Sequence, residues 1–277
     1  SYLLEWENMT HVAADTTLQE VFSSYHQFED WSNNANYILE KLGNAYLGKH
    51  YTESSPEEKI KASFISFNSV FKDTLEHCVY TSEIQNIQNL DYDIAKVESK
   101  VNSINEKLNL SRDVNNIAES GNIIILENAD EKFFGALLIK LLSKIQLGYY
   151  LRQQQKEITD VDLNSLANKE LKKIKEEIKA NWIKIAIVVT PICDYVQKNN
   201  KIYDRIVKGL LLPSKYKPFI DEKSEAVYVL PITINYNGKE YILILDFRYF
   251  STTDLSIEKA TPIFRLRQEL LAEIQSK

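Results

Sequence analysis

Two residues with chemically useful side chains, Cys193 and Asp194, directly follow the apolar run "IAIVVTPI". The β-branched residues of that run predict a buried strand that ends at Thr190-Pro191. A thiolate nucleophile needs a histidine or a cationic neighbour to lower its pKa, and all four histidines lie in the first third of the chain. We therefore expect Cys193 to turn inward as a small apolar side chain, and Asp194 to satisfy backbone or arginine groups at the turn.

A second constellation combines Asp194 with Asp246, which follows the apolar run "YILIL", and with Arg248 on the same strand face as Asp246. If neighbouring strands bring both carboxylates and Arg248 to one edge, the three residues could support metal-assisted hydrolysis. Otherwise Asp246 and Arg248 form an ion pair that locks the sheet. No third carboxylate or histidine is placed to complete a metal site, so we expect the structural pair, with no metal and no cofactor.

Charge is distributed unevenly along the chain. Residues 1–60 contain ten acidic and three basic residues, whereas residues 169–217 contain twelve basic and five acidic residues. The basic segment could face a phosphate or nucleic acid, although much of it lies in "KELKKIKEEIK", whose interleaved acids are also typical of a solvated helix face. Tyrosine-rich stretches such as "GYYLRQQQ" and "FRYF" could stack bases if they faced the basic segment. The residues predicted to form a partner or ligand surface are Cys193, Asp194, Tyr195, Lys198, Lys201 and Arg205.

Several classes of protein are disfavoured by composition. Cys78 and Cys193 match no disulfide framework or zinc ligand spacing, and no run of about 18 apolar residues could span a membrane. The stretch "GNAYLGKH" resembles a phosphate-binding loop, but His50 stands where that loop needs Ser or Thr. We expect a cytoplasmic protein that does not bind membranes.

The elements that would position these residues divide into two parts. Residues 1–115 have helical periodicity, with Ser55, Pro56 and Glu58 forming a predicted capping box at one helix start. The apolar positions from Ile87 to Leu108 recur with heptad spacing, which predicts either oligomerisation through 87–108 or antiparallel packing within the helical domain.

Residues 116–277 predict an α+β domain with five strands, one at 122–127 and four within 184–250. Helices are expected within 130–181, where "EKFFGALLIKLLSKIQLGYYL" predicts one deeply buried helix capped by Asp130, and a last helix at 263–276. Asn237-Gly238 predicts a hairpin, and Pro231 predicts an edge strand or a bulge. The expected fold is a small antiparallel, SH3-like, partly closed β-barrel with two inserted helices, preceded by a helical part.

The segments "EWENMTHVAADTTLQEV", "VVTPICDY", "AVYVLPI", "LDFRYF" and "TPIFRLRQELLAEIQ" resemble the region downstream of the receiver domain in a group of bacterial receiver-domain proteins. The resemblance covers nearly the whole chain and implies no catalytic residues. It implies an output region whose helices carry a signal from a preceding receiver domain.

Two functions follow as expectations. The first is a non-enzymatic signalling or regulatory module that binds a protein or nucleic acid. The alternative is a metal-assisted nuclease or other hydrolase of toxin-like SH3-barrel type that uses Asp194, Asp246 and Arg248.

Overall fold

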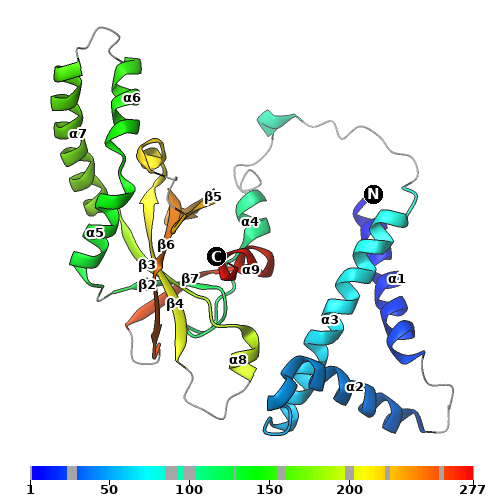
Figure 1. Ribbon diagram of the computed structural model, residues 1–277. Coiled ribbons are helices and arrows are strands. Elements are labelled where there is room, and N and C mark those ends of the chain that lie inside the picture. The colour runs from blue at the N-terminus through cyan, green and yellow to red at the C-terminus, as the bar shows by residue number, and fades with distance from the viewer. Residues whose placement is uncertain are drawn as a thin grey trace. The chain divides into compact units, whose positions relative to one another are not determined.

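The computed structural model describes residues 2–23, 30–84, 93–96, 104–127, 129–154, 160–196, 203–221, 225–255 and 259–276. The chain forms two compact units, drawn in Figure 1. The helical unit comprises residues 1–96 and 192–201, and the sheet unit comprises residues 97–191 and 202–277. The boundary therefore lies about twenty residues before the predicted one, because the segment 104–111 pairs and packs with the sheet.

The helical unit contains α1 (Tyr2–Phe22), α2 (Trp31–Leu47), η2 (Gly48–His50), α3 (Pro56–Thr81) and the short α8 (Ile192–Val196). Helix α3 packs against both α1 and α2. Two small residues of α3 bond directly to the backbone of α2. The Ser63 hydroxyl donates to the Leu39 carbonyl at 2.5 Å, and the Ser66 hydroxyl donates to the Leu42 carbonyl at 2.9 Å.

The predicted capping box at the start of α3 is confirmed. The Glu58 backbone N–H donates to the Ser55 hydroxyl at 3.3 Å, and the Ser55 backbone N–H donates to a Glu58 carboxylate oxygen at 2.7 Å. Two backbone donors of the first turn are thereby satisfied, which stabilises the helix start.

Most of the predicted heptad segment, residues 87–108, lies outside the described residues. The described parts are η3 (Ile94–Lys96) and α4 (Ile104–Asn109). The last two heptad positions, Ile104 and Leu108, are 52% and 64% exposed, so they do not pack within the sheet unit. Oligomerisation through 87–108 stays a prediction.

The sheet unit is built on a seven-stranded, curled antiparallel half-barrel (Figure 1). The strand order is β1-β7-β2-β3-β4-β6-β5. The strands are β1 (Leu110–Ser111), β2 (Asn122–Leu126), β3 (Ile183–Val188), β4 (Asp204–Pro213), β5 (Val227–Tyr236), β6 (Lys239–Thr253) and β7 (Ala260–Leu266). The five predicted strands are present as β2 to β6, and the α+β class is confirmed.

The predicted C-terminal helix at 263–276 was placed too early. Residues 260–266 form β7, which pairs with β2 so that Phe264 lies opposite Ile123, and only α9 (Gln268–Gln275) is helical. Phe264 and Leu266 alternate into the core with the two-residue period of a strand, which overrides the helical pattern that continues into α9.

Helices cover both faces of the sheet. On one face, α9 contributes Leu270, Leu271 and Ile274 to a core with the inward residues of β2, β3, β4, β6 and β7. The other face of β4 and β6 packs against α5 (Glu131–Leu141), α6 (Lys144–Gln154), α7 (Asp160–Asn181) and η4 (Ser214–Phe219).

In the described part of the segment between β2 and β3, three helices are inserted rather than the expected two. Asp130 caps α5 as predicted, with its carboxylate accepting from the Lys132 N–H at 2.9 Å. The expected long helix is interrupted because Leu142 forms a β-bridge with Ile220, and the Ser143 N–H donates to the Phe219 carbonyl at 2.9 Å. The helix therefore ends at Leu141, and a separate helix, α6, begins after these contacts.

Both turn predictions in the last hairpin are confirmed. Asn237 and Gly238 have φ angles of 50° and 75°, as required at the two central positions of a type I′ turn. Strand β5 lies at the sheet edge and is bulged between Val229 and Thr233, which accommodates Pro231.

Candidate functional site

Asp246 and Arg248 form the predicted ion pair, but at an unexpected position. Asp246 lies inside β6 rather than after a strand, at a wide irregularity where Val207 pairs with Phe250 and Gly209 pairs with Leu245. Four residues of β6, from Asp246 to Tyr249, therefore lie opposite Lys208 alone. An interruption of the ladder of this kind redirects side chains and bends the strand.

The Asp246 carboxylate is completely buried and engaged by one neighbour. Its Oδ1 accepts from Arg248 Nε at 2.8 Å and from the Arg248 backbone N–H at 3.1 Å, and its Oδ2 accepts from the guanidinium at 2.6 Å. These hydrogen bonds to Asp246 are the main reason that the pKa of Arg248 is raised. Because both carboxylate oxygens are occupied, Asp246 acts here as a structural anchor for the bulge.

Asp194 does not lie at a neighbouring strand end. Strand β3 ends at Val188, two residues before the predicted end, and the Thr190 hydroxyl accepts from the Arg205 backbone N–H at 2.7 Å. Asp194 is half-buried on α8, which belongs to the helical unit, whereas Asp246 and Arg248 belong to the sheet unit. Within the described residues, no group of three His, Cys, Asp or Glu side chains could hold a metal ion.

The other residues of the predicted partner surface are distributed in the same way. Tyr195 is half-buried on α8, and Arg205 is exposed on β4 in the other unit. Lys198, Lys201 and the side chain of Cys193 lie outside the part of the chain that the structure describes. The predicted surface is thus untested, and so is the inward orientation of Cys193.

A cluster of cations and aromatic rings surrounds the β6 bulge on the side covered by α5. We call it the cation–aromatic patch; its members are Phe133, Lys140, Lys208, Arg248 and Tyr249. The Phe133 and Tyr249 rings meet edge to face with centroids 4.4 Å apart. Lys208 Nζ lies 5.4 Å from the Phe133 ring centroid, and Lys140 Nζ lies 5.8 Å from that of Tyr249.

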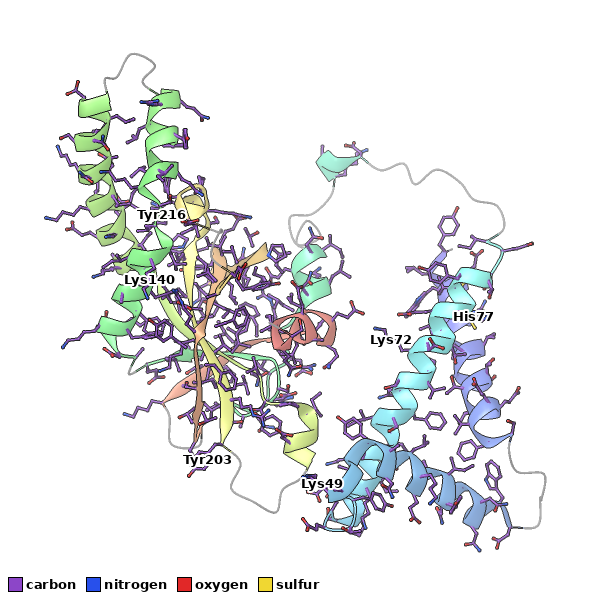
Figure 2. The ribbon with its side chains drawn as sticks, in the orientation of Figure 1. Lys49, Lys72, His77, Lys140, Tyr203 and Tyr216 are labelled. Carbon is purple, nitrogen blue, oxygen red and sulfur yellow. The ribbon has the colours of Figure 1, made fainter. Side chains whose placement is uncertain are left out.

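The cation–aromatic patch can attract anions. Among the described residues, neither Lys140 nor Lys208 has a carboxylate partner, and the Arg248 side chain is 41% exposed although it is paired. The sequence stretch "FRYF" includes Tyr249, whose ring could stack on a base if basic residues lay near it. The structure places lysines beside this ring. The contributions of Phe133 and Lys140 could not be read from the sequence, because they come from a helix more than 100 residues earlier. Figure 2 labels Lys140 on α5.

A second surface lies between the helices α6 and α7, which pack side by side and extend beyond the sheet (Figure 1). It is an open groove of about 270 Å³, here called the α6–α7 groove. Ile145 and Tyr149 on one wall are 71% and 66% exposed, which contradicts the expectation of a deeply buried helix. The lining residues are Lys144, Ile145, Gly148, Tyr149, Arg152, Leu163, Asn164 and Ala167.

The base of the α6–α7 pair is held to the sheet by η4. The Tyr216 hydroxyl donates to the Glu177 carboxylate at 2.7 Å, and this bond is the main cause of the lowered pKa of Glu177. The Tyr150 and Phe219 rings pack edge to face with centroids 5.1 Å apart. Tyr216, labelled in Figure 2, is almost completely buried, so the groove has a fixed end.

Comparisons with known proteins identify no relative: no family model, no curated protein and no solved structure matches the chain. In the described part of the chain, every helix is too short or too polar to cross a lipid bilayer.

Proposed function

We propose that this chain is a non-enzymatic regulatory module that binds a protein partner through the α6–α7 groove of its sheet unit. In this proposal it acts downstream of a receiver domain, as the resemblance of its sequence segments implies. The five strands β2 to β6 would correspond to an SH3-like, partly closed barrel, with β1 and β7 as additions at one edge.

The exposure of Ile145 and Tyr149 in an open groove is the observation that supports this proposal. When a partner covers large apolar side chains on a concave surface, their removal from water favours binding. A catalytic role has weaker support, because both oxygens of the Asp246 carboxylate already accept hydrogen bonds from Arg248.

Nucleic-acid binding is a second candidate, favoured by the cation–aromatic patch. Lysines next to partly exposed aromatic rings, such as those of Phe133 and Tyr249, are found on single-strand binding surfaces. The patch has few cations, however, and the sheet unit as a whole contains 25 basic and 23 acidic residues. Its attraction for a polyanion would therefore be weak and salt-dependent.

One experiment separates these functions. The full chain is incubated with single- and double-stranded RNA and DNA across a salt series, beside an Asp194→Ala/Asp246→Ala variant and a Lys140→Glu/Lys208→Glu variant. The protein-binding proposal expects no cleavage by any of the three proteins. Cleavage lost in the aspartate variant without unfolding would establish a nuclease, and salt-sensitive binding lost in the lysine variant would establish the nucleic-acid alternative.

A further inference from the structure

The buried ion pair of Asp246 and Arg248 fixes a guanidinium at the cation–aromatic patch. The completely buried Asp246 carboxylate accepts from Arg248 Nε and Nη2. An apolar pair would often stabilise a sheet as well, whereas this pair also fixes the direction of the guanidinium. Within the described residues, no acceptor bonds to the remaining nitrogen, Nη1, and the Arg248 side chain is 41% exposed. The guanidinium therefore keeps two unpaired N–H groups in a fixed orientation.

The Tyr249 hydroxyl lies near this guanidinium and beside a lysine. The Nζ of Lys140, which is labelled in Figure 2, is 3.5 Å from the Tyr249 hydroxyl oxygen. The pKa of Arg248 is raised mainly by its hydrogen bonds to Asp246 and, to a smaller extent, by the Tyr249 phenol, which is close enough to interact with the guanidinium charge. One hydroxyl and two cations thus meet at the irregularity of β6. Because the cations can only donate, the natural ligand of such a group is an oxyanion.

The patch has two positive charges that no carboxylate balances. The buried ion pair is neutral as a unit. In the described part of the chain, neither Lys140 nor Lys208 forms an ion pair, and the first acidic residue of α5, Glu131, is paired with Lys184 instead. A phosphate monoester carries a charge of about −1.5 to −2 near pH 7, which matches the two lysines. A phosphodiester carries one charge, and a nucleic-acid strand carries one for every nucleotide, which is more than the patch balances.

We propose that the cation–aromatic patch binds a small phosphate monoester. The phosphate lies beside the Tyr249 hydroxyl and accepts from Lys140 and Arg248. Lys208, on the other side of the Phe133 ring, attracts it at longer range. Both rings of the patch are half-buried, so they limit the water that competes for the phosphate. This site goes beyond the proposed protein-binding function and does not depend on the α6–α7 groove.

The test is a phosphorus NMR titration of the full chain with two small probes that differ in charge. Ribose 5-phosphate is a monoester dianion, and dimethyl phosphate is a diester with one negative charge. The proposal expects one ribose 5-phosphate bound per chain and at least about tenfold weaker binding of dimethyl phosphate, since only the dianion balances both lysines. Equal binding of the two probes, or no binding of either, would overturn the proposal.

Variants assign the binding to the patch. Lys140→Gln should weaken the binding of ribose 5-phosphate by about fivefold or more, and Tyr249→Phe, which keeps the ring, by about threefold. Lys144→Gln, on α6 outside the patch, is the matched control and should leave the affinity unchanged. Circular dichroism checks that all three variants are folded. Equal losses in Lys140→Gln and Lys144→Gln would show that only net charge matters and would reject the patch as the site.

A single strand of nucleic acid is the competing ligand. A short oligothymidylate without a terminal phosphate contains phosphodiesters only, so at physiological salt the proposal expects it to bind more weakly than ribose 5-phosphate. Tighter binding of this strand that is lost in Lys140→Gln would identify single-stranded nucleic acid as the ligand and reject the monoester.

Discussion

The two units of the chain bury their apolar residues in different ways. In the sheet unit, two large clusters of fully buried Ile, Leu, Val and Phe side chains lie on opposite faces of one sheet. In the helical unit, the apolar side chains that are fully or nearly buried among the described residues are few, and two of the four are alanines: Ala13, Ile38, Leu47 and Ala62. The sheet unit is therefore stabilised mainly by hydrophobic burial, whereas the helical unit adds serine hydrogen bonds and the packing of the Phe22 ring against Trp31 and Phe67 to a smaller buried core.

Charge and exposure reinforce this difference. The helical unit contains 16 acidic and 8 basic residues, whereas the sheet unit is close to neutral. Helix α1 exposes Leu3, Trp6 and Val12 by more than half of their surface. An acidic unit with a small core and exposed apolar residues is suited to rearrange, while the sheet unit is suited to hold a binding surface in a fixed shape.

The largest effect is expected in the sheet unit, at the buried ion pair. Arg248→Met leaves the completely buried Asp246 carboxylate with no cationic partner and only the backbone N–H of residue 248 as a donor, and breaking such an ion pair costs about 3–5 kcal/mol. Asp246→Asn should cost less, because the Arg248 side chain is 41% exposed and can be hydrated. Chemical denaturation at pH 7 measures both losses.

The double variant Asp246→Leu/Arg248→Met is the control, since it removes the unpaired charge and should recover most of the stability. Equal deficits for Arg248→Met and Asp246→Asn would show that the pair does not anchor the bulge.

Two helical glycines give opposite predictions in the two units. A Cβ on Gly43 in α2 would lie 2.8 Å from both the Lys59 carbonyl oxygen and the Ser63 hydroxyl, so Gly43→Ala should destabilise the helical unit by about 1–3 kcal/mol despite its better helix propensity. Gly148→Ala in α6 meets open space and should stabilise the protein by up to about 1 kcal/mol. Thermal unfolding of both variants tests the comparison, and a stabilising Gly43→Ala would show that α2 and α3 are not in close contact.

The sequence predicted features that depend on local chemistry. Ser55 and Glu58, Asp130, and Asn237-Gly238 act through atoms within a few residues of themselves, so their types and spacing were sufficient. The Asp246 to Arg248 pair was also local, because residues i and i+2 share a strand face.

Features that depend on distant partners were missed. The break after Leu141 requires Ile220, and β7 requires β2, which is about 140 residues earlier. The exposed wall of α6 was predicted to be buried because apolar content does not reveal which residues a neighbouring element covers. The α6–α7 groove, as a property of two packed helices, had no signal in either segment alone.

Removing the N-caps of α3 and α5 should cause smaller losses of stability, and the two losses should be similar. Ser55→Ala removes the acceptor for the Glu58 N–H at the start of α3, and Asp130→Ala removes the acceptor for the Lys132 N–H at the start of α5. Each should cost about 1 kcal/mol, since an N-cap contributes similarly wherever the helix lies. Urea denaturation with a probe in each unit would detect these losses. A much larger loss for Ser55→Ala would indicate that the helical unit depends on its caps more than the sheet unit does.

The last effect concerns Tyr228 on β5 and is confined to alkaline pH. Burial, followed by the negative charge of Glu273, raises the pKa of the Tyr228 hydroxyl to about 12. The unfolded chain loses this proton near pH 10, whereas the folded chain retains it, so the stability contribution of the neutral phenol is complete below pH 10 and is lost as the pH rises toward 12. Absorbance at 295 nm during an alkaline titration should show one tyrosine ionising last, and Tyr228→Phe should remove that step and flatten the fall in stability. A late step that persists in Tyr228→Phe would assign it to another tyrosine and show that the edge strand β5 leaves Tyr228 open to water.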